Sequence, residues 1–284
     1  MTRHATLRDG RRIAWEEAGD PDGFPMIGVH GNPGSRLSWL LPLRDQDLTG
    51  CRIILPDRPG VGESDPHPQG CEHDWSADVA ELADHLGADR FAIAGVSGGG
   101  PFALSVADRL RDRVSALALV ATGPVLDELI REAPTGARLF FKLGRDVPGL
   151  MRVRSAVLAQ RARRDPAALV QRTFVPYGAI DRAQLERPEV LDHLARDYAE
   201  AFRQGGRRSA DEMVQYANPW PIPEDLPVPT SLWCGRLDEI VSPRATEYLA
   251  GVLPHAEFHE MDRYGHLWFL DHGAEVFRDL ARHR

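Results

Sequence analysis

The sequence lacks the features that would tie it to a membrane or to nucleic acid. None of its 284 residues lies in an apolar run of membrane-spanning length, and its start, from Met1 to Arg12, is rich in arginine where a secretory leader would be apolar. The 34 basic residues are interspersed among 42 acidic ones, which gives a net charge of −8 and no basic stripe. We therefore expect a cytoplasmic protein with no membrane or nucleic-acid partner.

Cysteine is also scarce. Cys51, Cys71 and Cys234 form no C-x-x-C pair, and two of them lie in strand-like apolar runs, which is typical of small buried side chains. A cluster of His67, Cys71 and His73 lacks a fourth ligand and lies in a loop rich in proline and glycine. We therefore predict neither a metal site nor a cofactor.

Short apolar runs alternate with helical patterns along much of the chain. Val79, Leu82 and Leu86 share one helix face, and the segment 102–110 shows the same spacing. The runs typical of buried strands are Arg12–Glu16, Met26–Val29, Arg52–Leu55, Phe91–Val96, Ala116–Val120, Ser231–Cys234 and Glu257–Met261. This alternation predicts an α/β fold, with a mostly parallel twisted sheet and helices on both of its faces.

The alternation stops between residues 125 and 217. Asp165-Pro166 and Arg187-Pro188 are typical helix starts, and Ser209 with Glu212 matches a capping box. A proline-rich stretch then leads back to the sheet pattern at about residue 230. We predict a core domain of residues 1–124 and 218–284, and an inserted all-helical cap domain of residues 125–217 over the carboxyl edge of the sheet.

Two further features of the insertion have ordinary explanations. The basic run of Arg161, Arg163 and Arg164 is typical of a solvated helix face. Most of the aromatic residues are expected to form the core between helices, with only a minority lining a pocket. These aromatic residues are Phe140, Phe141, Phe174, Tyr177, Tyr198, Phe202 and Tyr216.

The most informative motif is Gly95-Val96-Ser97-Gly98-Gly99, which follows one predicted strand and precedes a predicted helix. In this order, G-x-S-x-G is the pattern of a nucleophile elbow, a tight turn that exposes a serine hydroxyl. The flanking glycines avoid collisions with the neighbouring strand and helix. The helix that follows offers free N–H groups to negative charge. Ser97 is therefore the candidate nucleophile.

A serine hydroxyl needs a base, and the base needs an acid to orient it. Asp238 follows the strand that ends at Cys234, and His266 follows the strand that ends at Met261. Both therefore lie at carboxyl ends of strands, where catalytic groups of open α/β sheets gather. The alternatives to His266 are His259, within a strand pattern, and His272, within the last helical region; those to Asp238 are Glu239 and Asp262.

Together these segments resemble a capped, serine-nucleophile member of the α/β-hydrolase superfamily over nearly the whole chain. The order Ser97, Asp238, His266 is the one expected in that family. The segment from His30 to Ser35 resembles the family's oxyanion segment, so the resemblance implies that the backbone N–H groups of Asn32 and Gly98 hold the oxyanion. The turn from Asp57 to Gly62 also matches the family, and we expect it to be architectural, like the side chain of His30.

The resemblance implies hydrolysis of carboxylic esters, or of related lactones and acyl compounds, of a small to medium, largely apolar small-molecule substrate, without a metal or organic cofactor. A serine at position 97 and a glycine at 98 disfavour the epoxide hydrolases and haloalkane dehalogenases, which use a carboxylate at the elbow. Lactonases, amidases, peptidases, C–C bond hydrolases and biosynthetic cyclases or acyltransferases remain open, because substrate choice depends on the cap. A ligand-sensing protein without turnover is the alternative from another class.

Overall fold

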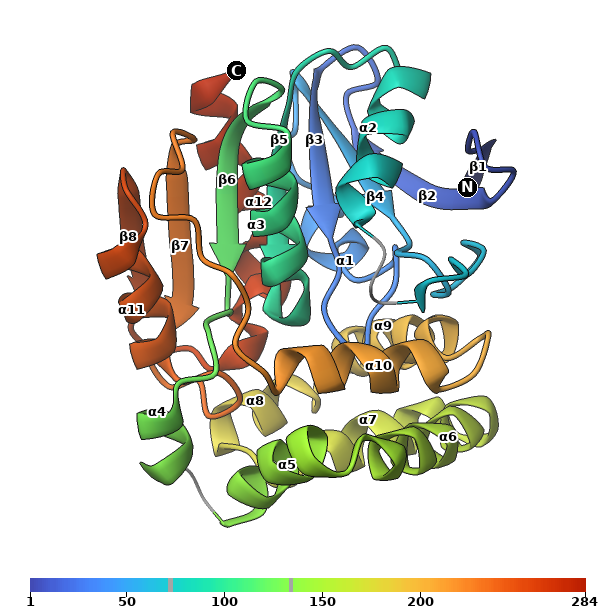
Figure 1. The fold of residues 1–284 in the computed structure, drawn as a ribbon, viewed down its shortest axis with the longest axis vertical. Helices are drawn as coiled ribbons and strands as arrows, with labels where there is room; N and C mark the ends of the chain where they lie inside the picture. Colours follow the sequence, from blue (N-terminus) through green and yellow to red (C-terminus); the bar gives the residue numbers. More distant parts are fainter. Residues whose placement is uncertain (71–73, 133–134) are drawn as a thin grey trace.

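A mostly parallel sheet organises the computed structural model, which describes residues 1–70, 74–132 and 135–284 (Figure 1). The strand order is β1-β2-β4-β3-β5-β6-β7-β8, with β1 and β2 antiparallel to their neighbours and the others parallel. The strands are β1 Arg3–Thr6, β2 Arg12–Gly19, β3 Phe24–Val29, β4 Cys51–Pro56, β5 Phe91–Val96, β6 Val114–Val120, β7 Thr230–Gly235 and β8 Ala256–Met261. The fold prediction and all seven predicted strands are confirmed. β1 was not predicted, because its four residues are mostly polar and only one of them, Ala5, is buried.

Helices cover both faces of the sheet. Successive side chains of each strand point to opposite sides, so both faces are apolar and both pack against helices. Met26 and Ala92 pack in one apolar cluster with the helices α1 (Leu40–Leu43) and α12 (Phe269–Leu280). Their neighbours Ile27 and Ile93 pack in a second cluster on the other face. The helices of that second face are α2 Trp75–His85, α3 Gly100–Arg109 and α11 Pro243–Val252.

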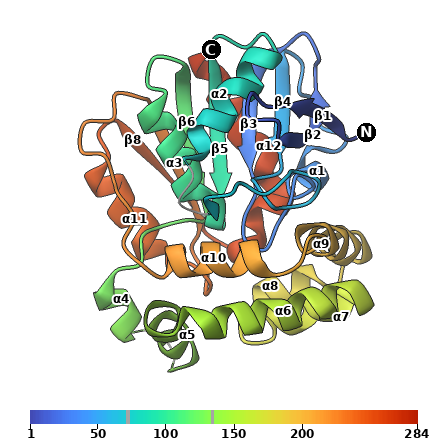
Figure 2. The ribbon, with the colours of Figure 1, turned by 45° about the vertical axis from the view of Figure 1, so that its right-hand side comes forward.

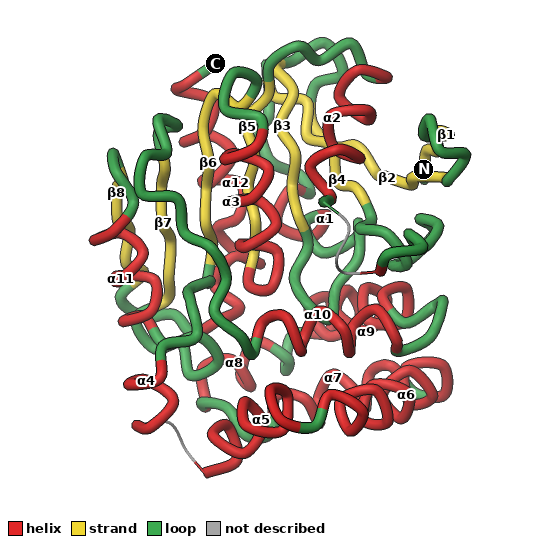
Figure 3. The backbone as a smooth tube through the Cα atoms, in the orientation of Figure 1, coloured by secondary structure: helices red, strands yellow, loops and turns green. Residues whose placement is uncertain are grey.

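The segment between β6 and β7 is helical in the part that the structure describes. Its helices lie together beyond the carboxyl ends of the parallel strands (Figures 2 and 3). They are α4 Asp127–Glu132, α5 Thr135–Asp146, α6 Pro148–Arg164, α7 Pro166–Phe174, α8 Ala179–Gln184, α9 Pro188–Ala201 and α10 Arg207–Tyr216. We call α4 to α10 the helical insertion.

The predicted helix starts at Pro166 and Pro188 are confirmed. Asp165 is the N-cap of α7, where its side chain accepts a hydrogen bond from the Ala168 N–H. The predicted basic run from 161 to 164 is solvated, since its three arginines are exposed. Buried side chains of the helical insertion, such as Phe174 and Phe202, join the apolar cluster of the α12 face. The insertion and the sheet therefore share one continuous core.

Candidate active site

Ser97 lies at the turn between β5 and α3. Its backbone φ is +52°, in the left-handed region that costs a residue with a side chain about 1–3 kcal/mol. Glycine is required at both flanks of this turn. A Cβ on Gly95 would lie 2.6 Å from the Gly99 carbonyl oxygen, and a Cβ on Gly99 would lie 2.5 Å from the His30 carbonyl oxygen. The turn therefore has the strained geometry expected of a nucleophile elbow.

Asp238 and His266 are brought together at the neighbouring strand ends. His266 Nδ1 donates to Asp238 Oδ2 across 2.7 Å, and both residues are buried. The other oxygen of Asp238 accepts from the N–H groups of Ile240 and Val241, which fixes the orientation of the carboxylate. Burial alone would lower the pKa of His266, but the charge and hydrogen bond of Asp238 outweigh it and raise that pKa. Among the hydrogen bonds of the described residues, none joins Ser97 Oγ to His266.

The alternative candidates have other partners. His259 stacks on Trp233 with ring centroids 3.9 Å apart. His272 bonds to Tyr264 and Glu275, and Asp262 pairs with Arg236 at an exposed position. Of the histidines weighed from the sequence, His266 is the one that the structure pairs with Asp238.

The two backbone groups expected to hold an oxyanion lie side by side. A Cβ on Gly98 would be 3.2 Å from the backbone nitrogen of Asn32. The Gly31 carbonyl, in the same peptide unit as the Asn32 N–H, accepts from His30 Nδ1 at 2.9 Å and from Arg58 Nη2 at 3.1 Å. Because C=O and N–H point in opposite directions across a trans peptide, these two donors aim the Asn32 N–H away from Arg58.

His30 serves as a fixed, neutral support. Its Nδ1 donates to the Gly31 carbonyl, while its Nε2 accepts from the Arg58 N–H at 3.2 Å. Burial, together with the positive charge of Arg58, lowers the pKa of His30 well below its ordinary value. A histidine with both ring nitrogens engaged and its charged form disfavoured cannot act as the base for Ser97, which agrees with the structural role expected from the sequence.

A buried ion pair links the segment of His30 and Gly31 to the helical insertion. Arg58 is fully buried, and its guanidinium donates to both carboxylate oxygens of Glu212 on α10, at 2.9 and 2.8 Å, and to the His30 carbonyl. Burial alone would raise the pKa of Glu212, but the charges of Arg58 and Arg208 lower it to about 2. The turn after β4 is therefore architectural, as expected, although its arginine also orients a predicted oxyanion donor.

The predicted capping box at Ser209 and Glu212 is wrong. The helix α10 begins three residues earlier than the box predicts, with Gly206 and not Ser209 as its N-cap, so Ser209 lies inside its first turn. Its hydroxyl donates to Asn32 Oδ1 at 2.8 Å, and Asn32 Nδ2 donates to the Ser209 carbonyl at 3.1 Å. Both side chains of the motif bind residues of the core, Ser209 to Asn32 and Glu212 to Arg58. Local spacing in the sequence cannot reveal such partners.

Of the aromatic residues in the insertion, Tyr216 reaches the predicted nucleophile. Its hydroxyl lies 3.3 Å from the Ser97 carbonyl oxygen and 2.9 Å from Thr122 Oγ1, and burial raises its pKa to about 12. Phe174, Tyr198 and Phe202 are buried in the shared core. The side chain of Phe140 lies outside the described residues.

Asp181 on α8 is a residue that the sequence did not indicate. Its two carboxylate oxygens accept from the backbone N–H groups of His266, at 3.0 Å, and Leu267, at 2.8 Å. The helix α8 has only six residues and no apolar repeat that marks its position. The hydrogen bonds that join the insertion to Asn32, Ser97 and His266 could be found only from the folded structure.

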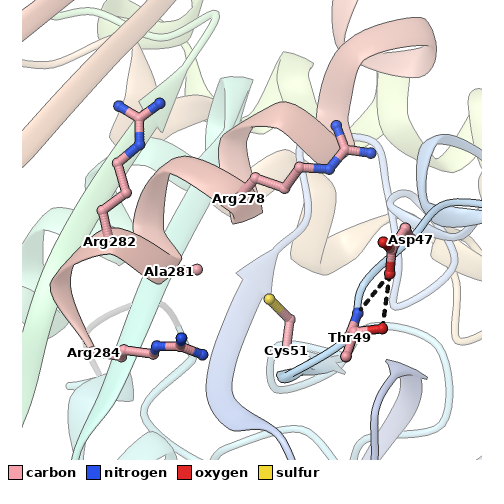
Figure 4. A pocket seen from close by; sticks show the side chains of 7 residues that line it. All are labelled: Asp47, Thr49, Cys51, Arg278, Ala281, Arg282 and Arg284. Carbon is pink, nitrogen blue, oxygen red and sulfur yellow. Dashed lines mark hydrogen bonds between the residues drawn. The ribbon is translucent and has the colours of Figure 1, made fainter.

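The cavity drawn in Figure 4 lies elsewhere. It measures about 440 Å³ and is lined by residues near the start of β4, such as Cys51, and by arginines near the end of the chain, such as Arg278 and Arg284. The start of β4 is at the amino edge of the parallel strands, opposite the edge that carries Ser97. This cavity is therefore separate from the candidate site.

The described residues offer no metal site and no membrane-spanning helix. Within them, no group of three His, Cys, Asp or Glu side chains is placed to hold a metal ion. Cys71 and His73, named above for the cluster with His67, lie outside the described residues, while Cys51 and Cys234 are buried free thiols. In the same part of the chain, none of the helices combines the length and the apolar character needed to cross a bilayer.

Sequence comparison places the chain among known proteins. A family model described as the alpha/beta hydrolase fold matches residues 25–273. A probable proline iminopeptidase from Streptomyces coelicolor is 38% identical over 125 residues, which are 40% of this chain and 38% of that protein. A dihydrolipoyllysine-residue acetyltransferase component of the acetoin cleaving system from Pseudomonas putida is 32% identical over 209 residues, 71% of this chain and 51% of that protein. The chain thus spans about two fifths to one half of the length of these relatives.

Solved structures show the same fold over the full chain. An esterase from Thermogutta terrifontis matches 99% of this chain and 97% of its own with a TM-score of 0.71 and 24% identity. The enol-lactonase from Burkholderia xenovorans matches 99% of this chain and 98% of its own with a TM-score of 0.70 and 19% identity. At these identities, the likeness shows the fold alone.

Proposed function

The chain belongs to the α/β hydrolase family, and we propose that it is a serine hydrolase that cleaves carboxylic esters, or related lactones and acyl compounds, of a small to medium, largely apolar substrate. One observation carries the proposal. Ser97 sits at a positive φ between β5 and α3, while His266 and Asp238, joined by a 2.7 Å hydrogen bond, lie at the ends of β8 and β7. These are the parts of an acyl-transfer site in a parallel sheet.

In the proposed reaction, Ser97 Oγ attacks the ester carbonyl carbon and passes its proton to His266 Nε2. Asp238 holds the proton on Nδ1 and stabilises the imidazolium that forms. The N–H groups of Asn32 and Gly98 stabilise the tetrahedral oxyanion, and the loss of one such donor typically costs roughly 3–4 kcal/mol of transition-state stabilisation. His266 then gives the proton to the leaving alkoxide, and a water activated by the same nitrogen releases the acid.

The helical insertion is proposed to select the substrate. We assign residues 125–217 to a cap domain and residues 1–124 and 218–284 to the core. The location of α10 supports this assignment, since Ser209 and Tyr216 contact Asn32 and Ser97. A substrate bound at Ser97 would therefore lie against the insertion, whose side chains decide which acyl and alcohol groups fit.

A panel of p-nitrophenyl esters tests the proposal. Ser97→Ala should lower kcat/KM by about 10⁴-fold or more, because it removes the nucleophile. Ser105→Ala, an exposed serine on the next helix, is the matched control and should keep wild-type rates. A fluorophosphonate probe should add one adduct to the wild type at Ser97, seen by intact mass. Absence of both turnover and adduct, with tight binding of a small ligand, would identify a sensing protein.

Release of N-terminal proline is the second candidate. Several relatives named proline iminopeptidases match this chain, among them the Streptomyces protein at 38% identity over 125 residues. The same scaffold and nucleophile can serve amide bonds, so the choice depends on the leaving group and the insertion. Comparing kcat/KM on L-proline p-nitroanilide with that on the best p-nitrophenyl ester decides between the two candidates.

A further inference from the structure

We propose that Asp181 is a positioning residue for His266: its carboxylate fixes the backbone of the histidine loop, residues 265–267, and its charge helps to stabilise the imidazolium. This inference rests on the proposed function, because it assigns Asp181 a role in proton transfer from Ser97. It would make one side chain of the helical insertion part of the machinery that sets the rate.

The geometry of the carboxylate supports positioning. Its Oδ2 accepts from the His266 N–H at 3.0 Å and its Oδ1 from the Leu267 N–H at 2.8 Å, so both oxygens bind consecutive residues of the loop. Asp181 is 1% exposed, so water does not compete for these bonds. A carboxylate offers one oxygen to each N–H group, and hydrogen bonds to charged acceptors are roughly twice as strong as neutral ones. Burial raises the pKa of Asp181, and the hydrogen bonds from Leu267 and His266 partly offset that effect.

The residue before the histidine permits this approach. A Cβ on Gly265 would lie 2.4 Å from Asp181 Oδ2, a distance that side-chain carbons do not adopt. Any other residue at position 265 would push the carboxylate off the two N–H groups. Glycine is therefore required at position 265 by a tertiary contact, because the Asp181 carboxylate of the insertion lies against its Cα.

Two carboxylates act on the imidazole. Asp238, from the loop after β7, binds Nδ1 directly, and Asp181, from α8, adds a second negative charge that favours the protonated ring. The third element packed against the loop is α12, and its ionisable groups there are engaged elsewhere: Asp271 binds Arg187 and Gln184, and His272 binds Tyr264 and Glu275.

The charge predicts a direction for the pH profile. The proposed base must be neutral to accept the Ser97 proton, so the rate rises with pH through the pKa of His266. Removing the Asp181 charge destabilises the imidazolium, which lowers that pKa and moves the acid limb of the profile to lower pH. Loss of loop alignment should lower the plateau rate as well.

The experiment measures the rate of fluorophosphonate labelling of Ser97 from pH 4.5 to 8.5, which requires no knowledge of the natural substrate. For Asp181→Asn we expect the acid limb to move down by about 0.5–1 pH unit and the plateau to fall about 10-fold. Asp181→Glu keeps the charge but shifts its position, so the plateau should fall while the limb stays. Asp271→Asn, which also removes a carboxylate that joins the insertion to the core, should leave the limb in place.

The outcomes are distinct. A limb in Asp181→Asn that coincides with that of the wild type overturns the proposal, whatever happens to the plateau. If that variant does not fold, as judged by near-ultraviolet circular dichroism, a wild-type plateau in Asp181→Glu overturns it instead. A wild type that is not labelled at Ser97 at any pH contradicts the proposed function, and a titration of the His266 ring by NMR in the wild type and Asp181→Asn still tests the charge effect.

Discussion

The faces of the sheet and the junction with the helical insertion are both buried, yet they are held together differently. The strands β5 and β6 are buried along their whole length and contact α3 and α12 through apolar side chains. At the junction, where the helical insertion packs on the strand ends and loops of the sheet, the contacts are both apolar and polar. The insertion places three buried carboxylates there, those of Glu212, Asp197 and Asp181. Each of these three accepts hydrogen bonds from the core.

The difference separates stability from geometry. Apolar packing is roughly proportional to the area buried and tolerates changes of shape, so it stabilises the sheet without fixing one atom relative to another. Buried polar contacts contribute little net stability, but each hydrogen bond requires a defined distance and angle between its partners. At the junction these partners include Asn32 and the histidine loop, where the proposed chemistry needs a defined geometry.

The largest expected effect is from Glu212→Ala at the junction. It leaves the Arg58 guanidinium buried without its carboxylate, which should lower the free energy of unfolding by about 3–5 kcal/mol. Urea denaturation measures the loss. Glu200→Ala is the control, because its partner Arg36 keeps Asp57 as a second carboxylate. Equal losses in the two variants would show that the Arg58–Glu212 pair contributes no more to stability than the Arg36–Glu200 pair.

A core substitution should affect stability and not turnover. Leu117→Ala on β6 removes a fully buried side chain and should lower the free energy of unfolding by about 2–5 kcal/mol. At a temperature where the variant remains folded, kcat on an ester substrate should stay within about twofold of wild type. A fall in kcat of about 10-fold, as large as the loss of labelling rate expected for Asp181→Asn, would remove the contrast between the two regions.

Asp197 makes the junction sensitive to pH. Burial raises its pKa to about 7, with the nearby Asp57 charge adding to the effect. Because the folded protein then binds this proton more tightly than the unfolded chain, the contribution of Asp197 to stability decreases as pH rises from about 4 to about 7. Asp197→Asn keeps one side-chain oxygen to accept from the Ser35 N–H and hydroxyl, and should raise Tm by about 2–4 °C at pH 7.5, and by less at pH 5. An equal change at both pH values in a scanning calorimeter would contradict this.

The smallest effect is expected from Tyr216→Phe. The change removes the hydroxyl that bonds Thr122 and the Ser97 carbonyl, and should cost about 1 kcal/mol of unfolding free energy. A decrease in kcat of a few-fold with unchanged KM should accompany it, since the bond acts on the backbone of the proposed nucleophile. A rise in KM alone would instead place this tyrosine against the substrate.

The sequence alone predicts the structure correctly where the local pattern and the tertiary environment favour the same conformation. The apolar runs of the sheet and the glycines around Ser97 require one kind of structure wherever they occur, so the fold and the elbow turn could be predicted. The pairing of His266 with Asp238 followed from their positions after two strands. The strand β1 was missed, because three of its four residues are polar and its place is set by pairing with β2.

Side chains that act across the junction could not be predicted. Ser209 and Glu212 fit a local cap, yet Asn32 and Arg58, far away in the sequence, bind them in the folded chain. Asp181 carries no local signal, since its role depends on the approach of a loop 85 residues later in the sequence. Long-range partners of this kind leave no periodicity to find.

The three contacts from the insertion to Asn32, Ser97 and His266 limit how the chain can be recombined. A chimera that exchanges residues 125–217 for the corresponding helices of another member of the family would discard Asp181, Ser209 and Tyr216 together with the side chains proposed to select the substrate. On the proposed role of Asp181, we expect such a graft to bind the substrate of its donor but to turn it over slowly. Successful grafts should be those whose donor supplies an acceptor for the histidine loop and a partner for Asn32, so these positions are the ones to restore first.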